Sequence, residues 1–514
     1  MPKFSDLPSE LVLEVCDFLL SGSPKTLERA FAGESNAYLC GYDICKAIRQ
    51  GWKDVLNLSC SSRRYRELLV DQHNHVYRTI AVGGYNNFKQ LLSLLRFLDK
   101  KPELATGVKT LYLTLIPEFT TSYMAELQID DLKLIRTQAA AANISYSKNL
   151  WTKPKPSEKR ICRLSADYDY DYGEMCDCEY CMDMWDDCGD FDEEEPHASC
   201  DYERMGMLTS LILHKMKGLE QFGCSISKDS FSMVGDGKQC SLPILPELQY
   251  LAIAKEFTEH EISPNDFKVL TGLGNTMTHL CLSDIGPVQG HVSESGLRIQ
   301  KFENIAHLVL TGMAFCNETL CEFLDDFCGP LTSFKFLPEI TGMTYWDFAY
   351  EVTAMPQEVV DALLPKHADS LRTLCIDFTW FHDDDFWFER EVIDTLEGFV
   401  NLESLWIDCD CISVPWFGDD SDNDSEIADA DVFGRPKNVV IEDLPRNLRQ
   451  IYFAGGLENI MPDLARLAAN SNVFPRLESI ELDRNEKEIV ETMTAKGFKP
   501  SLATVKRATM WDTE

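Results

Sequence analysis

A six-residue pattern of apolar residues recurs along most of this chain and limits the folds that it can adopt. The pattern is Φ-x-x-Φ-x-Φ, where Φ is an apolar residue, and we call each occurrence a frame. Frames stand at 108–113 (VKTLYL), 208–213 (LTSLIL), 248–253 (LQYLAI), 277–282 (MTHLCL), 305–310 (IAHLVL), 331–336 (LTSFKF), 371–376 (LRTLCI), 402–407 (LESLWI), 448–453 (LRQIYF) and 477–482 (LESIEL). The last three positions alternate as in a strand with one buried face, so each frame predicts one short strand.

The spacing of the frames indicates a repeat. From residue 208 onward they are 40, 29, 28, 26, 40, 31, 46 and 29 residues apart. The shorter spacings match the period of about 20–29 residues found in leucine-rich repeats, and the longer ones require insertions. Helix-like stretches lie between frames, at 318–327 and 389–399. Because one strand and one helix cannot bury their apolar faces alone, the expected fold is an α/β solenoid with parallel strands that resembles a leucine-rich-repeat array. An irregular α/β domain is the alternative.

The two faces of such a sheet have different predicted roles. Leu280 and Leu282 are expected inside with Cys281 outside, and Val309 and Trp406 are expected outside in their own frames. An open concave face that carries aromatic and charged residues suits partner binding, although any one of them is more simply a solvated surface residue. The candidate partner-binding residues are Tyr250, His279, His307, Lys335, Trp406, Asp408 and Tyr452.

The N-terminal region predicts a small helical bundle. Residues 7–19 (LPSELVLEVCDFL) place an apolar stripe at helical spacing, and Pro8 is tolerated only in the first turn. The residues of this stripe are Leu11, Val12, Val15, Phe18 and Leu19. A second helical segment covers 54–69, and a third, at 86–98, ends before Pro102.

The first two of these segments resemble the F-box family. Leu7, Pro8, Glu10 and Leu11 match its opening Leu-Pro-x-Glu-Leu, and its later motif is matched by Asp54, Val55, Leu58, Ser62, Arg63 and Tyr65. The run from the third helix through VKTLYL also looks like fungal F-box proteins. The resemblance implies an adaptor-binding surface made by Leu7, Pro8, Glu10, Leu11, Val15, Leu56 and Leu58. An ordinary amphipathic helix that begins with Leu-Pro is the alternative.

This resemblance implies a function. The chain would be the substrate-recognition subunit of an SCF-type ubiquitin ligase, bound to a Skp-type adaptor and through it to a cullin, with an unknown protein substrate on the array. The alternative is a repeat scaffold without a ubiquitin-ligase role, whose N-terminal bundle only caps the solenoid. Partner subunits would carry out ubiquitin transfer, so the chain is not expected to be an enzyme and needs no cofactor.

The expected domains are an F-box-like region at 1–75 with an insertion at about 20–53, a helical linker and first repeat at 76–164, and the array at 206–514. An acidic, Cys-rich insertion lies between them at 165–205. Residues 165–203 hold sixteen Asp and Glu, and 417–431 hold seven more, with no Lys or Arg in either run, out of a net charge of −36. Such runs are typical of solvated loops, and the acidic balance disfavours nucleic acid as a partner.

The acidic insertion also contains a possible metal site. Cys178 and Cys181 have zinc-ligand spacing, and Cys188 and Cys200 could complete a thiolate set, but a second C-x-x-C is missing. A solvated loop is therefore the preferred interpretation, with no metal expected.

Missing motifs and the cysteine content bear on the class of function and on the location of the protein. There is no Gly-rich phosphate loop, G-x-S-x-G or H-E-x-x-H, and no apolar run that predicts a membrane span. Nineteen cysteines without a secretory signal favour the cytoplasm or nucleus.

Overall fold

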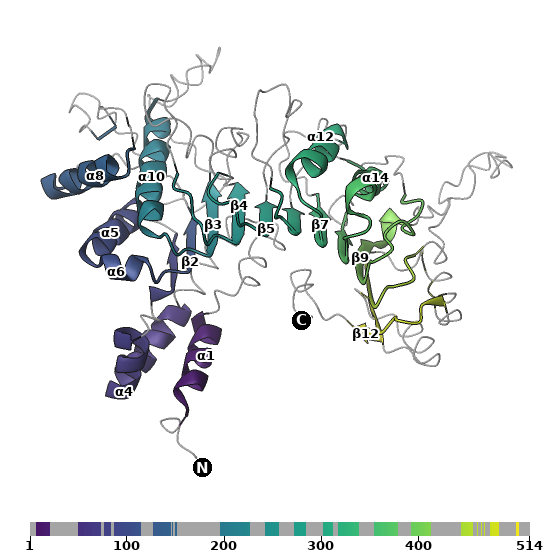
Figure 1. The fold of residues 1–514 in the computed structure, drawn as a ribbon, viewed down its shortest axis with the longest axis horizontal. Coiled ribbons are helices and arrows are strands. Elements are labelled where there is room, and N and C mark those ends of the chain that lie inside the picture. The colour runs from purple at the N-terminus through teal and green to yellow at the C-terminus, as the bar shows by residue number, and fades with distance from the viewer. Residues whose placement is uncertain are drawn as a thin grey trace, which may run out of the picture.

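In the part of the chain that the structure describes, twelve strands form one all-parallel β-sheet and follow one another in sequence order (Figure 1). The computed structural model describes residues 7–20, 50–72, 77–83, 87–114, 127–144, 146, 150–151, 196–226, 242–255, 272–283, 302–311, 317–338, 354–378, 392–412, 444–455, 460, 464, 467, 473–482 and 500–502. The strands are β1 (Thr79–Val82), β2 (Thr110–Thr114), β3 (Gln221–Ile226), β4 (Tyr250–Lys255), β5 (His279–Ser283), β6 (His307–Thr311), β7 (Ser333–Leu337), β8 (Thr373–Ile376), β9 (Ser404–Asp408), β10 (Gln450–Ala454), β11 (Ser479–Leu482) and β12 (Pro500–Leu502).

The register of the strands confirms the predicted solenoid-like stacking. Leu280 pairs with Leu308, and Leu308 pairs with Phe334, so the frames at 277, 305 and 331 are parallel neighbours. The last two apolar residues of each of these frames are buried in one continuous core. The same row of core residues continues across the sheet to Ile480 in β11. The period of two in the frames therefore predicted both the strands and their inward face.

One frame was assigned wrongly. Residues 208–213 do not form a strand but lie in the helix α10 (Pro196–Lys215). Apolar residues three apart suit a helix as well as a strand, and every residue from 204 to 213 is buried, so periodicity alone could not separate the two. The strand of this repeat is β3, in which Phe222 and Cys224 are the inward apolar residues, and Leu219 just before it takes the first apolar position. Strands β1 and β12 were also not predicted.

Helices cover one face of the sheet (Figure 1). They are α5 (Asn87–Lys100), α6 (Pro102–Ala105), α10, α12 (Asn317–Glu322) with the π-helical segment η5 (Phe323–Phe327), and α14 (Pro356–His367). A further helix, α8 (Ile129–Ala141), packs against α10. Apolar residues of these helices, such as Leu95, Leu211 and Leu363, belong to the same buried cluster as the inward strand residues. The predicted helix at 318–327 is confirmed. The one at 389–399 is wrong over its described part, because 392–399 contain no helix.

A repeated backbone contact sets the register at the start of the strands from β2 to β11. The carbonyl oxygen of Lys109, for example, accepts hydrogen bonds from the N–H groups of both Glu220 and Gln221, at 2.9 Å each. In the other turns from Arg78 to Arg449, one carbonyl oxygen likewise accepts hydrogen bonds from two consecutive N–H groups. Because a shift by one residue would break both bonds and turn the apolar side chains outward, this contact favours a single register.

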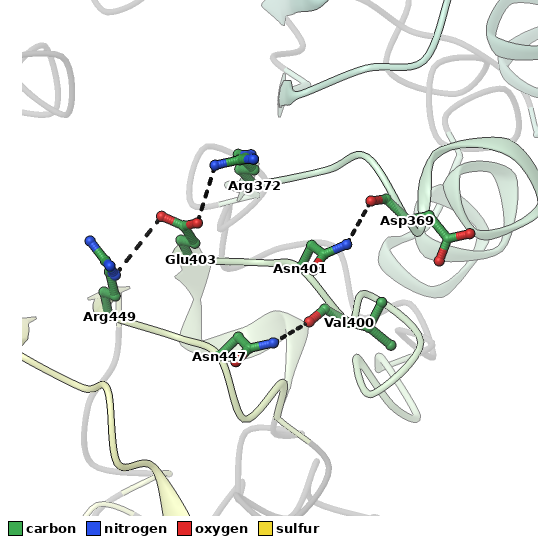
Figure 2. Close-up of polar contacts among 7 residues, drawn as sticks. All are labelled: Asp369, Arg372, Val400, Asn401, Glu403, Asn447 and Arg449. Atoms are coloured by element: carbon green, nitrogen blue, oxygen red, sulfur yellow. Dashed lines mark hydrogen bonds and ion pairs between the residues drawn. The ribbon is translucent and has the colours of Figure 1, made fainter.

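Polar side chains also join consecutive turns just before the strands. Figure 2 shows Glu403 between Arg372 and Arg449, with N–O distances of 3.4 and 3.9 Å. The Asn447 amide donates to the carbonyl oxygen of Val400 at 2.6 Å, and Asn401 makes the equivalent bond one turn earlier. Exposed ion pairs add little stability, so these contacts mainly order the turns relative to one another.

A glycine before β7 provides a test of this close stacking. A Cβ on Gly329 would collide with the backbone carbonyl of Glu303 in the preceding turn. Since backbone cannot move aside cheaply, we expect Gly329→Ala to lower the free energy of unfolding by about 1–3 kcal/mol. At Gly107 a Cβ would meet its nearest atom at 3.4 Å, an ordinary contact, so Gly107→Ala is the matched control. Equal urea midpoints for the two variants would contradict the tight approach of these turns.

Candidate functional site

Helix α1 (Ser9–Leu20) has two apolar faces, only one of which is covered. Val12 and Cys16 are fully buried, whereas Leu11 and Val15 remain 44% and 37% exposed. Pro8 is also exposed, and it lies one helical turn before Leu11. Residues three or four apart share a helix face, so Pro8, Leu11 and Val15 form one uncovered apolar strip, which we call the α1 strip.

The buried face of α1 packs into a small core of its own. This core is separate from that of the sheet and unites Val12, Cys16, Val55, Tyr65, Leu68 and Leu69. Its other helices cover residues 50–61, α4 (Arg63–Arg66) and the π-helical segment η2 (Glu67–Gln72). We call residues 7–20 and 50–72 the N-terminal module.

Polar contacts hold the parts of this module together. The Arg64 guanidinium donates to the carbonyl oxygen of Leu7 at 2.8 Å, which ties the start of α1 to α4. The hydroxyl of Ser62 accepts from the backbone N–H of Tyr65 at 3.2 Å and caps α4. The Arg64 contact and the buried face of α1 hold this helix with the α1 strip facing outward.

The structure thus places the predicted adaptor-binding residues in one module but divides them by exposure. Pro8, Glu10, Leu11 and Val15 are exposed, while Leu7, Leu56 and Leu58 are half-buried. The sequence predicted one stripe in which Leu11, Val12 and Val15 act together. Val12 instead belongs to the core, and its spacing of four from Cys16 was the signal that could have separated it.

The second face of the sheet, opposite the helices, is not open as predicted. Cys281, Val309 and Trp406 do point to this face, but each is at most 5% exposed. Of the seven predicted partner-binding residues, Tyr250, Lys335, Trp406, Asp408 and Tyr452 are buried. The expectation of exposed middle residues is therefore wrong, although the direction of these side chains was predicted correctly.

Contacts between neighbouring strands contribute to this burial. The rings of Trp406 and Tyr452 stack with centroids 3.5 Å apart, and the indole N–H of Trp406 donates to Asp377 at 3.3 Å. Two clusters form on this face, one of Tyr112, Tyr250, Ala252, Ala254, Cys281 and Val309, and one of Leu337, Cys375, Trp406, Tyr452 and Ala454. The sequence signal was the aromatic or apolar residue at the middle position of several frames.

Three ionisable side chains are buried on this face of the sheet. Lys335, Asp377 and Asp408 are all buried, at most 2% exposed, although a charge is costly to bury without compensation. Burial raises the pKa of the neighbouring Cys375 thiol well above its ordinary range, an effect that Lys335 opposes and Asp377 strengthens. Cys375 is thus a neutral thiol near neutral pH, unsuited to act as a nucleophile.

The accessible part of the predicted partner face is the pair His279 and His307. Both are half-buried, and their rings stack in parallel with centroids 4.1 Å apart. Burial, and secondarily His307, lowers the pKa of His279 to about 4. The residues at the same position in the next strands are Ser333, Thr373, Ser404 and Gln450. Except for Ser333 they are half-buried, so a polar strip crosses the sheet here.

The two histidines with lowered pKa values predict a loss of stability in mild acid. Burial, and then Lys366, also lowers the pKa of His367 to about 4, and the ring of His367 is fully enclosed. Between pH 6.5 and 4 the unfolded chain binds a proton at each histidine that the folded chain does not. Stability is therefore complete above pH 6.5 and falls as the pH drops toward 4.

We expect His367 to account for a loss on the order of 1 kcal/mol per pH unit in this window, with a smaller share from the more exposed His279. His367 accepts the Leu331 N–H at Nδ1, and Asn can supply an oxygen in a similar place. The variant His279→Asn/His367→Asn should therefore show a shallower fall in Tm between pH 6.5 and 5.5. Equal slopes for the variant and the original chain would contradict the assignment.

The possible zinc ligands Cys178, Cys181 and Cys188 lie outside the described residues, and of Cys200 only the backbone, in α10, is described. Within the described ranges, no three side chains of His, Cys, Asp or Glu gather so as to hold a metal ion. The acidic run at 417–431 also lies outside the described residues. So does the insertion at 20–53, apart from Leu20 at the end of α1 and residues 50–53, which are helical.

In the part of the chain that the structure describes, no helix is both long and apolar enough to cross a membrane. Comparison with protein-family models and with curated proteins gives no match to this chain. A functional assignment therefore depends on the α1 strip, the second sheet face and the motifs of the N-terminal module.

Proposed function

We propose that this chain is the substrate-recognition subunit of an SCF-type ubiquitin ligase. The observation that carries the proposal is the uncovered α1 strip on a separately packed module at the start of a repeat array. Leu11 and Val15 stay exposed although Val12 and Cys16 of the same helix are fully buried. An apolar strip kept on the surface in this way suits a protein partner, and a Skp-type adaptor is the partner that the F-box resemblance implies.

The target would bind the array and not the N-terminal module. The polar strip around His279 and His307 is a half-buried, accessible part of the second sheet face, and we place the first contact with a target there. The chain would hold its target while partner subunits, including a cullin, carry out ubiquitin transfer. Its own contribution is proximity and orientation, which needs no catalytic group or cofactor. We place this activity in the cytoplasm or nucleus.

Affinity purification of the full chain from cells, followed by mass spectrometry, tests this proposal. An adaptor and a cullin should both be recovered, and the purified chain and adaptor should co-elute from a sizing column. Recovery of array-binding proteins without either subunit would contradict the proposal and favour a repeat scaffold.

A further inference from the structure

The first strand of the array has an incompletely covered end. In β1 the inward residue Ile80 is only partly buried, whereas its register partners Leu111 and Phe222 in the next two strands are completely buried. Among the strands that the structure describes, β1 pairs with β2 alone, so its other edge has no partner within the described residues. A stack of repeats leaves apolar surface at its end unless another element caps it.

The N-terminal module meets the array at this end. Tyr77 packs against the core of the module, and its ring lies 5.4 Å, between centroids, from the ring of Phe97 in α5. Phe97 in turn packs against the core of the array. The very next residue, Arg78, already belongs to the sheet, because its carbonyl oxygen accepts the N–H groups of Lys109 and Thr110. Tyr77 therefore contacts the module while the next residue, Arg78, already contacts the sheet.

We infer that the N-terminal module is also the N-terminal cap of the array, and that the contact between Tyr77 and Phe97 is the joint that holds the α1 strip at a fixed angle to the sheet. Phe97 lies near the end of α5, six residues after the buried Leu91, and α5 contacts β1, so the joint acts on the first repeat directly. The module uses its inner face for its own core, and Tyr77, which follows the module in the chain and packs against that core, makes the capping contact. This leaves the α1 strip free for a partner, and that last point alone rests on the proposed function.

Hydrogen exchange in the full chain tests the cap. Phe97→Ala removes the joint from the array side without touching the module core, to which Phe97 does not belong. Amides of β1 should exchange at least about tenfold faster, while those of β9 keep their protection, because local opening follows local stability. Tyr77→Leu, which keeps apolar volume but loses the ring, should have the same effect. Tyr77→Phe is the matched control and should behave like the original chain.

A distance measurement tests the fixed angle. Spin labels are introduced as non-natural amino acids at the exposed residues Glu14 in α1 and Lys133 in α8, since nineteen cysteines preclude thiol labelling. The original chain should give one narrow distance distribution and Phe97→Ala a broad one. Unchanged β1 exchange in Phe97→Ala and Tyr77→Leu, equal acceleration in β9, or equally broad distributions would each overturn the inference. No adaptor enters either measurement, so their outcome is separate from that of the proposed function.

Discussion

Trp406→Ala is expected to lower the free energy of unfolding by about 3–5 kcal/mol, as much as truncating a large residue in an ordinary core. Trp406 lies on the second sheet face and not on the helix-covered face, yet it is only 3% exposed. Truncation would remove the ring stacked on Tyr452 and the indole N–H that bonds Asp377. The buried Asp377 would lose a donor, which adds to the cost of the cavity.

Ser404 provides the control, because it lies on the same strand and face but is half-buried. Ser404→Ala should change the free energy of unfolding by less than about 0.5 kcal/mol. Urea unfolding followed by fluorescence and circular dichroism measures both variants. A loss below about 1 kcal/mol for Trp406→Ala would mean that the second face is open, as the sequence alone predicted.

The order and direction of the strands could be predicted because they depend on local pattern. The frames at 277, 305 and 331 have three apolar positions at strand spacing and regular separation, and these strands are parallel neighbours. Because alternate residues of a strand point to the same side, the sequence also predicted that His279 and Cys281 lie on one face of the sheet. Where the pattern was equally compatible with a helix, as at 208–213, the prediction failed.

Which side chains stay accessible could not be predicted, because burial depends on tertiary contacts. Trp406 and Tyr452 are aromatic residues at positions expected outside, and nothing local shows that their rings stack between strands. In α1, Leu11 and Val12 are adjacent and similarly apolar, so the sequence placed both in one stripe. Only the packing of Val55 and Tyr65 against Val12 shows which part of the helix faces inward.

Leu11→Asp is expected to abolish adaptor binding while leaving the chain folded. Leu11 is 44% exposed and outside the module core, so the change should cost less than about 0.5 kcal/mol in unfolding free energy. A buried carboxylate in an apolar interface, however, loses its hydration without gaining a partner. We therefore expect the affinity for the adaptor to fall at least about 100-fold, the effect of losing a central contact residue.

Asn57→Asp is the matched control, since it adds the same charge to an exposed position of residues 50–61 in the same module. Calorimetric titration of a purified Skp-type adaptor into the full chain and these two variants tests the central claim most directly. The account predicts tight one-to-one binding by the original chain and by Asn57→Asp, and none detectable by Leu11→Asp. Binding of Leu11→Asp with undiminished affinity, or no binding by the original chain, would contradict it.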